Sequence, residues 1–387
     1  MNEVLKYLTA EHDNMLACLQ TVVEHETPSN GAKGDNDEFV SKLARLFSEL
    51  TGGTAKTIHN DAAYGNHLLA TYGEGAEQIL ILCHYDTVWP KNTITHNPFR
   101  VKDGRAYGPG VYDMKAGIVQ GLFAIKALRA LGKKLNKKVV FLFTSDEELG
   151  SPSSRGIIEH EAAKSKYVLV LEPSAGENGK PLGAIKTARK GVGMFDIKVK
   201  GVAAHAGAAH KDGRSAIGEM AKQVDYIHSL TDHNEGLTLN VGVIRGGTES
   251  NVVAAECFAS VDVRIWSKEQ ADMITFQLTN LQPLTPDVKI EVKGGINRPP
   301  MERKDSVAEL YELAKSLAIN ELGMDDLPER AVGGGSDGNF TCVLAPTLDG
   351  LGAVGDGAHA DHEYVVIEEM PKRAALVALL LEKLANK

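Results

Sequence analysis

Continuous apolar runs and helical spacings alternate along the first half of the chain. Apolar runs at 78–83, 137–145 and 166–172 are typical of strands that are covered on both faces. A long helical stretch near 116–131 separates the first two runs, and an earlier helix with apolar residues from Phe39 to Leu50 is predicted to end at Gly52-Gly53. This order predicts an α/β fold with a mixed, largely parallel sheet flanked by helices.

The pattern changes at about residue 191. Residues 191–294 are predicted to form a strand, a helix, two strands, a helix and a strand, with polar and apolar positions alternating in the strands. This is the order of a ferredoxin-like βαββαβ unit. The α/β pattern returns after residue 300, with helices near 304–321 and 367–385. We therefore predict a first domain made of residues 1–189 and 299–387, and a second domain of residues 190–298 inserted into it.

Composition and charge exclude several classes of protein. The 387 residues are 43% hydrophobic and 24% charged, with 42 basic and 51 acidic side chains, which is ordinary for a globular protein. The acidic balance, without a long basic cluster, argues against a nucleic acid partner. Residues 1–13 carry charges where a signal peptide would be apolar, and no apolar run approaches a membrane span. We expect a cytoplasmic protein without a membrane partner, with its four separated cysteines as buried free thiols.

Groups that commonly bind metal ions follow the predicted strands. The candidates are His84 and Asp86, Glu147 and Glu148, Glu172, Asp113 at the start of a helix, and His359 in a late loop. Ligands in open α/β sheets bind beyond the carboxyl ends of the strands. Any one of these residues alone could be a helix cap, and the acidic run 146–148 could be a solvated turn. Two imidazoles and three carboxylates together suit a pair of zinc ions that one carboxylate bridges.

Six segments, in chain order, resemble the co-catalytic zinc peptidases. They are HYDTV at 84–88, GVYDMKAG at 110–117, SDEELGS at 145–151, LEP at 171–173, HAG at 205–207 and, in looser form, the late GxxHxxxE at 355–363. This family includes glutamate carboxypeptidases, aminoacylase, acetylornithine deacetylase, succinyl-diaminopimelate desuccinylase and several dipeptidases. The resemblance spans nearly the whole chain and is nearest to the glutamate carboxypeptidases, partly because Glu172 rather than aspartate occupies the position after the third strand.

The resemblance implies a role for each candidate of the metal site. The implied zinc ligands are His84 and Glu172 for one ion, Glu148 and His359 for the other, and Asp113 as the bridge. Asp86 would orient the imidazole of His84, and Glu147 would be the general base. Adjacent side chains on a strand point to opposite sides, so Glu147 and Glu148 cannot fill the same place. Cobalt or manganese would also accept these ligands, and His362 is the alternative to His359.

The resemblance also implies groups that bind the substrate. His205, from the partner subunit of a homodimer formed through the inserted domain, would polarise the scissile carbonyl; the alternative is a turn residue at a strand end. Asn251 and Arg264 would hold the substrate carbonyl and its free carboxylate, although Arg264 could instead pair with Asp262. The remaining candidates, which would offer backbone donors to a carboxylate, are Gly334, Gly335 and Ser336.

Together these features predict a zinc-dependent carboxypeptidase. It would hydrolyse the amide bond to a C-terminal amino acid with a free carboxylate, glutamate by resemblance, with a metal-bridging hydroxide and Glu147 as the general base. The alternative is an N-acyl-amino-acid amidohydrolase with the same dizinc mechanism. A non-catalytic binding protein would be free to lose motif positions, and none is lost here. A structural zinc site is disfavoured because such sites are usually closed by cysteine and histidine.

Overall fold

The computed structural model describes residues 2–60, 63–177 and 179–387, which form two compact units. Unit 1 contains the described residues up to Ala188 together with Arg303–Val332 and Ser336–Lys387, and unit 2 contains Arg189–Glu302. Unit 2 also includes the short segment Gly333–Gly335, which the sequence analysis assigned to the first domain.

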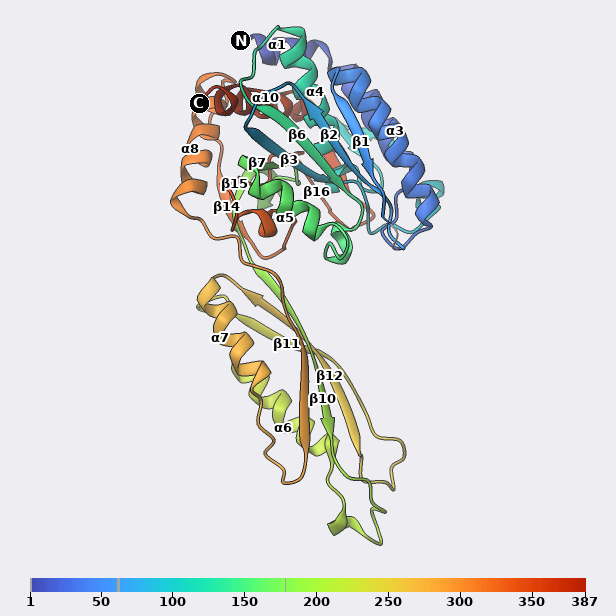
Figure 1. The fold of residues 1–387 in the computed structure, drawn as a ribbon. Helices are drawn as coiled ribbons and strands as arrows, with labels where there is room; N and C mark the ends of the chain where they lie inside the picture. The colour runs from blue at the N-terminus through green and yellow to red at the C-terminus, as the bar shows by residue number, and fades with distance from the viewer. Residues whose placement is uncertain (1, 61–62, 178) are drawn as a thin grey trace. The chain divides into compact units, whose positions relative to one another are not determined.

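Unit 1 is built on a six-stranded mixed sheet (Figure 1). The strand order is β1 (Thr54–Ile58), β2 (His67–Tyr72), β6 (Lys138–Thr144), β3 (Gln78–His84), β7 (Ser165–Val170) and β15 (Thr347–Leu348). The pairs from β6 to β15 are parallel, whereas β2 pairs antiparallel with both β6 and the edge strand β1. Every residue of β3 is buried, as its continuous apolar run predicts. The structure therefore confirms the mixed, largely parallel sheet.

Helices cover both faces of this sheet. On one face, Leu80 and Leu82 of β3 join a buried apolar cluster with Ile158 and Phe340, which lie on α5 (Arg155–Ala163) and α9 (Gly338–Thr341). The helices of the other face and of the periphery are α1 (Glu3–Ala10), α2 (His12–Val23), α3 (Lys33–Thr51), α4 (Ala116–Ala130), α8 (Asp305–Asn320) and α10 (Met370–Ala385). Helix α4 is buried on nearly all sides, and α3 ends at Gly52 in the left-handed conformation (φ 73°), as predicted.

Two small sheets complete unit 1. One consists of β16 (Gly355–Asp356), β17 (Tyr364–Val366), β5 (Arg105–Tyr107) and β4 (Arg100–Lys102). The other consists of β14 (Glu329–Val332), β9 (Lys180–Arg189) and β8 (Ala175–Glu177). The first small sheet carries the 357–363 turn between β16 and β17, which contains His359.

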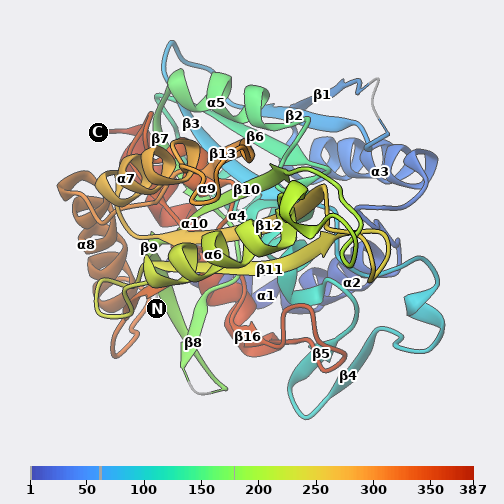
Figure 2. The same cartoon turned by 90° about the horizontal axis from the view of Figure 1, so that it is seen from below.

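Unit 2 is a four-stranded antiparallel sheet with two helices on one face (Figure 2). Its elements are β10 (Gly191–Lys200), α6 (Ala216–Ser229), β11 (Thr238–Gly246), β12 (Glu256–Ile265), α7 (Lys268–Thr279) and β13 (Lys289–Arg298). The order in the sheet is β11-β12-β10-β13, which is the ferredoxin-like arrangement. Buried and exposed residues alternate along β10 and β12, and the buried side packs against α6 and α7. This confirms the predicted βαββαβ unit.

Two further features concern the chain as a whole. Cys83 and Cys257 are buried, Cys18 and Cys342 are half-buried, and none of the four forms a disulfide. No helix within the described ranges combines the length and the apolar character that crossing a membrane requires.

Candidate metal centre

The predicted metal ligands come from separate elements of unit 1 and meet at one edge of the large sheet. His84 is the last residue of β3, Glu148 lies in the 3₁₀ turn Glu147–Leu149 after β6, and Glu172 follows β7. Asp113 lies in the turn Val111–Lys115 that leads into α4, and His359 lies in the β16–β17 turn. The carboxyl ends of parallel strands lie at the same edge of a sheet, so the side chains that follow each strand come close together there.

The five side chains form two groups that share Asp113. In the first group, Nε2 of His84 lies 3.2 Å from Asp113 Oδ1 and 3.3 Å from Glu172 Oε1. In the second, Nε2 of His359 lies 3.4 Å from Asp113 Oδ2 and 3.2 Å from Glu148 Oε2. Each oxygen of Asp113 therefore faces a different imidazole, which is the arrangement that a bridging carboxylate requires.

The electrostatics of the two groups favour added positive charge. Glu148 Oε1 is buried without a hydrogen-bond partner in the described part of the chain, and burial raises the pKa of this carboxyl group. Burial lowers the pKa of His84, but the carboxylates around it, Asp113 first, raise that pKa well above its ordinary value. Hydrogen bonding to Asp113 and Glu148 raises the pKa of His359 to about 10. The donor set fits divalent cations, which would replace these protons.

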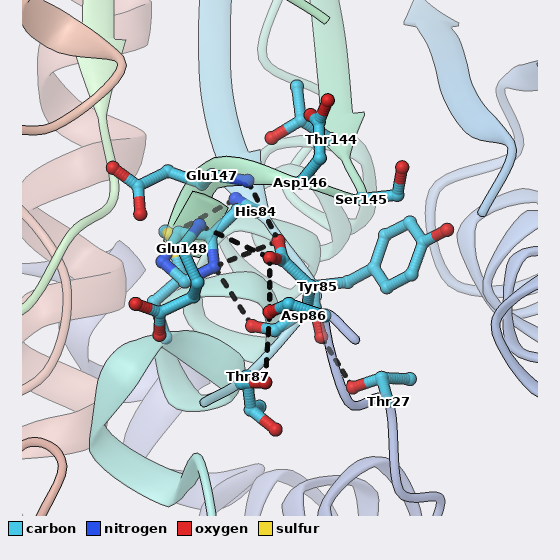
Figure 3. A network of polar contacts seen from close by, with 12 residues as sticks. Thr27, His84, Tyr85, Asp86, Thr87, Thr144, Ser145, Asp146, Glu147 and Glu148 are labelled. Carbon is cyan, nitrogen blue, oxygen red and sulfur yellow. Dashed lines mark hydrogen bonds and ion pairs between the residues drawn. The ribbon is translucent and has the colours of Figure 1, made fainter. Parts of the chain in front are cut away.

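Asp86 contacts His84 through both its backbone carbonyl and its carboxylate (Figure 3). Nδ1 of His84 donates a hydrogen bond to the backbone carbonyl of Asp86 (3.0 Å), whereas the nearer carboxylate oxygen is 3.5 Å away. With the proton on Nδ1, the lone pair of a neutral imidazole lies on Nε2, which faces Asp113 and Glu172. The fully buried carboxylate of Asp86 also accepts the hydroxyl of Ser29 (2.7 Å) and the backbone N–H groups of Glu147 and Glu148 (3.2 Å each).

The acidic run 146–148 divides into three different environments. Asp146 is fully buried, and its carboxylate accepts the backbone N–H and the hydroxyl of Ser153 (2.6 Å each) and the hydroxyl of Ser154 (2.6 Å). Glu147 and Glu148 lie in a 3₁₀ turn and not on a strand, so the predicted reason for their divergence is wrong. Figure 3 nevertheless shows their carboxylates reaching different positions, because the turn rotates successive side chains around its axis.

The late loop brings only one of its two candidate histidines to the cluster. His359 belongs to the second ligand group, whereas His362 is exposed and is absent from both groups. Sequence reasoning did not assign a role to Glu363, which is buried and accepts N–H groups from Gly110, Tyr112 and Asp113. The only signal for Glu363 in the sequence is its place in the late motif.

His205 and Asn251 are neighbours in unit 2. His205 is exposed, and its Nδ1 accepts the backbone N–H groups of Gly207 and Ala208 (3.1 Å each). The neutral ring therefore carries its hydrogen on Nε2. The backbone N–H of Ala206 donates to the carbonyl of Asn251 (2.9 Å), which fixes the two segments side by side.

Arg264 also lies in unit 2, where it is paired as the alternative prediction states. Its Nε and Nη2 donate to the two carboxylate oxygens of Asp262 at 2.8 and 3.0 Å. A substrate carboxylate would have to compete with Asp262 for the guanidinium group.

The glycine-rich segment is held by its carbonyls. Nη1 of Arg189 donates to the backbone carbonyls of Gly334 (3.1 Å) and Gly335 (3.2 Å), and all three residues belong to unit 2. Ser336 is fully buried, its hydroxyl donates to Asp349 (2.6 Å), and its backbone N–H donates to Asn339 (2.8 Å). Both donors of Ser336 are therefore already used within the protein, so the expected donation to a substrate would require breaking one of these bonds.

The fold and the site define a class of protein: an α/β protein with an inserted ferredoxin-like domain and two adjacent histidine–carboxylate groups suited to metal ions. Residues 80–383 match the model of peptidase family M20/M25/M40. The chain belongs to this family, and it is a metallopeptidase. The resemblance stated from the sequence motifs is confirmed, and so is the enzyme class.

Known relatives place the chain within the family. It is 30% identical over 389 residues to carboxypeptidase G2 from Pseudomonas sp. (strain RS-16), covering 98% of this chain and 91% of that protein. It is 27% identical over 336 residues to succinyl-diaminopimelate desuccinylase from Dechloromonas aromatica, covering 82% of this chain and 86% of that protein. A solved Bacillus subtilis protein, described as a dinuclear metal binding peptidase from the M20 family, has the same fold (TM-score 0.69, 15% identity, 98% and 99% coverage).

Proposed function

We propose that the protein is a zinc-dependent carboxypeptidase that hydrolyses the amide bond to a C-terminal amino acid with a free carboxylate, glutamate in particular. The observation that carries this proposal is the pair of ligand groups that share Asp113. His84 and Glu172 would hold one zinc ion, and Glu148 and His359 the other. Cobalt or manganese would suit the same donors.

Each residue near the cluster has a definite task in this proposal. When bound, the two ions supply Lewis acidity and lower the pKa of a water molecule. Glu147 accepts a proton from the attacking water and delivers it to the departing nitrogen. Asp86 fixes the backbone of the turn that carries Glu147 and Glu148, since its carboxylate accepts both of their N–H groups.

The groups of unit 2 are proposed to bind the substrate. His205 would donate its Nε2 hydrogen to the developing oxyanion, and its neutral tautomer suits this task. Asn251 would hold the substrate carbonyl, and Arg264 with the backbone of Gly334 and Gly335 would hold the free carboxylate. We further propose a cytoplasmic homodimer, formed through unit 2, in which His205 serves the partner's active site.

A substrate panel tests the proposed reaction. Metal-loaded protein is incubated with dipeptides and with N-acyl amino acids that vary in the acyl group and in the released residue, and free amino acid is measured. We expect release to be fastest for C-terminal glutamate and to be lost when its α-carboxylate is converted to an amide. Faster cleavage of simple acetyl or succinyl derivatives would favour the N-acyl-amino-acid amidohydrolase, an activity class to which the desuccinylase relative belongs by name. Release independent of the α-carboxylate would contradict both.

A further inference from the structure

A buried carboxylate lies behind the metal centre and accepts an unusual number of hydrogen bonds. Glu363 is 1% exposed. Its Oε1 accepts the backbone N–H groups of Tyr112 (2.8 Å) and Asp113 (3.0 Å). Its Oε2 accepts the backbone N–H of Gly110 (2.9 Å) and the indole N–H of Trp89 (2.9 Å). All four donors are neutral N–H groups, and together they satisfy both oxygens of this buried carboxylate.

These hydrogen bonds determine where Asp113 lies. Asp113 precedes the first residue of α4, Ala116, and its backbone is not helical (φ −111°, ψ 95°), so its N–H has no acceptor in the helical ladder of α4. A buried backbone N–H needs another acceptor, and Glu363 supplies it. The same carboxylate also holds Tyr112, the preceding residue. Glu363 therefore fixes the backbone on which the shared ligand is carried.

Glu363 also closes the turn that carries His359. The backbone N–H of Ala360 donates to the carbonyl of Gly357, and the N–H of Glu363 donates to the carbonyl of Ala360 (2.9 Å each). The backbone of His359 has φ 63°. Residues other than glycine adopt this left-handed conformation when the surrounding structure imposes it. Anchoring the end of the turn through Glu363 is one way to impose it.

The two ligand groups do not depend equally on the hydrogen bonds of Glu363, which we call the anchor. In the first group, His84 ends β3 and Glu172 lies two residues after β7, so strands of the central sheet carry both ligands. In the second group, His359 depends on the turn that Glu363 closes. Both groups share Asp113. Loss of the anchor should therefore weaken the second group more than the first.

We propose that Glu363 is a positioning residue that sets the affinity of the ion position formed by Asp113, Glu148 and His359. The proposal rests on the two-metal site of the proposed function. Glutamine at this position would keep the shape but turn an NH₂ group toward some of the four donors, which leaves N–H groups without an acceptor. Loss of such an outer partner commonly lowers metal affinity by about 10- to 100-fold.

Zinc binding to the metal-free full-length protein tests this proposal. Bound ions are counted by equilibrium dialysis with elemental analysis, and Co²⁺ absorption spectra report the coordination of each added ion. Glu363→Gln is compared with wild type and with Glu368→Gln, a control that changes an exposed glutamate close by in sequence. We expect wild type and Glu368→Gln to bind two ions, and Glu363→Gln to keep one while the dissociation constant of the second rises by about 10- to 100-fold.

A milder variant keeps the test decisive if Glu363→Gln fails to fold. Trp89→Phe removes one of the four donors to Glu363 together with part of the indole ring, and it should weaken binding of the second ion in the same direction, by a smaller factor. Unchanged affinity for both ions in the folded variants, or equal weakening of both, would overturn the proposal. If wild type itself binds fewer than two ions, the proposed two-metal site fails instead, which separates the two outcomes.

Discussion

Replacing Glu147 with glutamine is expected to lower kcat by about 10²- to 10⁴-fold while two metal ions remain bound. Glu147 is absent from both ligand groups, and its backbone N–H is held by Asp86 (3.2 Å). An amide at this position keeps the size of the side chain but cannot accept a proton. The loss should therefore fall on the chemical step, and steady-state kinetics with a C-terminal glutamate substrate would measure it.

The neighbouring residue provides the matched control. Glu148→Gln makes the same chemical change one position later, in a side chain that belongs to the second ligand group. This variant should lose bound metal as well as activity, and metal analysis of the two proteins distinguishes the roles. Retained activity in Glu147→Gln, or loss of metal from it instead of from Glu148→Gln, would show that the roles have been assigned incorrectly.

Replacing Arg373 with methionine is expected to lower the free energy of unfolding of unit 1 by about 3 to 5 kcal/mol. Arg373 is 1% exposed, and burial lowers its pKa to about 10, so it stays charged at neutral pH. It donates to the carbonyls of Gly352 and Gly183 (2.9 Å each) and to that of Gly350. Methionine would fill much of the volume but leave three buried carbonyls without their donor.

Urea denaturation followed by tryptophan fluorescence measures this loss. The chain has two tryptophans, Trp89 in unit 1 and Trp266 in unit 2, so a Trp266→Phe background reports unit 1 alone. Lys383→Met, at an exposed position of the same helix, is the control and should change stability by less than about 0.5 kcal/mol. An Arg373→Met variant as stable as this control would refute the proposed structural role.

The central sheet was predictable because the sequence of each of its buried strands contains a continuous apolar run. Strands β3, β6 and β7 each contain an unbroken apolar stretch, at 79–83, 139–143 and 167–170, as burial on both faces demands. The edge strand β1, with the sequence TAKTI, has no fully buried residue and gives no such signal. Strands β16 and β17 have two and three residues, too few for a periodicity to emerge. Strand β17 also pairs with the distant strand β5, a contact that a local pattern does not contain.

At the metal centre, too, local patterns were predictable and contacts between distant residues were not. His84, Glu148 and Glu172 were found because each follows an apolar run, and parallel strands bring such positions together. Glu363 was not assigned a role because its partner Tyr112 lies 251 residues away in the sequence. The burial of Ser336 could not be foreseen either, since its hydroxyl is used by Asp349, which only the folded chain brings near.

Dependence of glutamate release on added metal tests the central claim most directly. Metal-free protein is titrated with Zn²⁺ while release from an N-acyl glutamate is followed, and circular dichroism monitors the fold before and after a chelator is added. We predict no release without metal, a rise to a maximum near two ions per chain, and complete loss on chelation with the secondary structure retained. Full activity in the metal-free protein, or unfolding that accompanies every loss of activity, would contradict a catalytic metal centre.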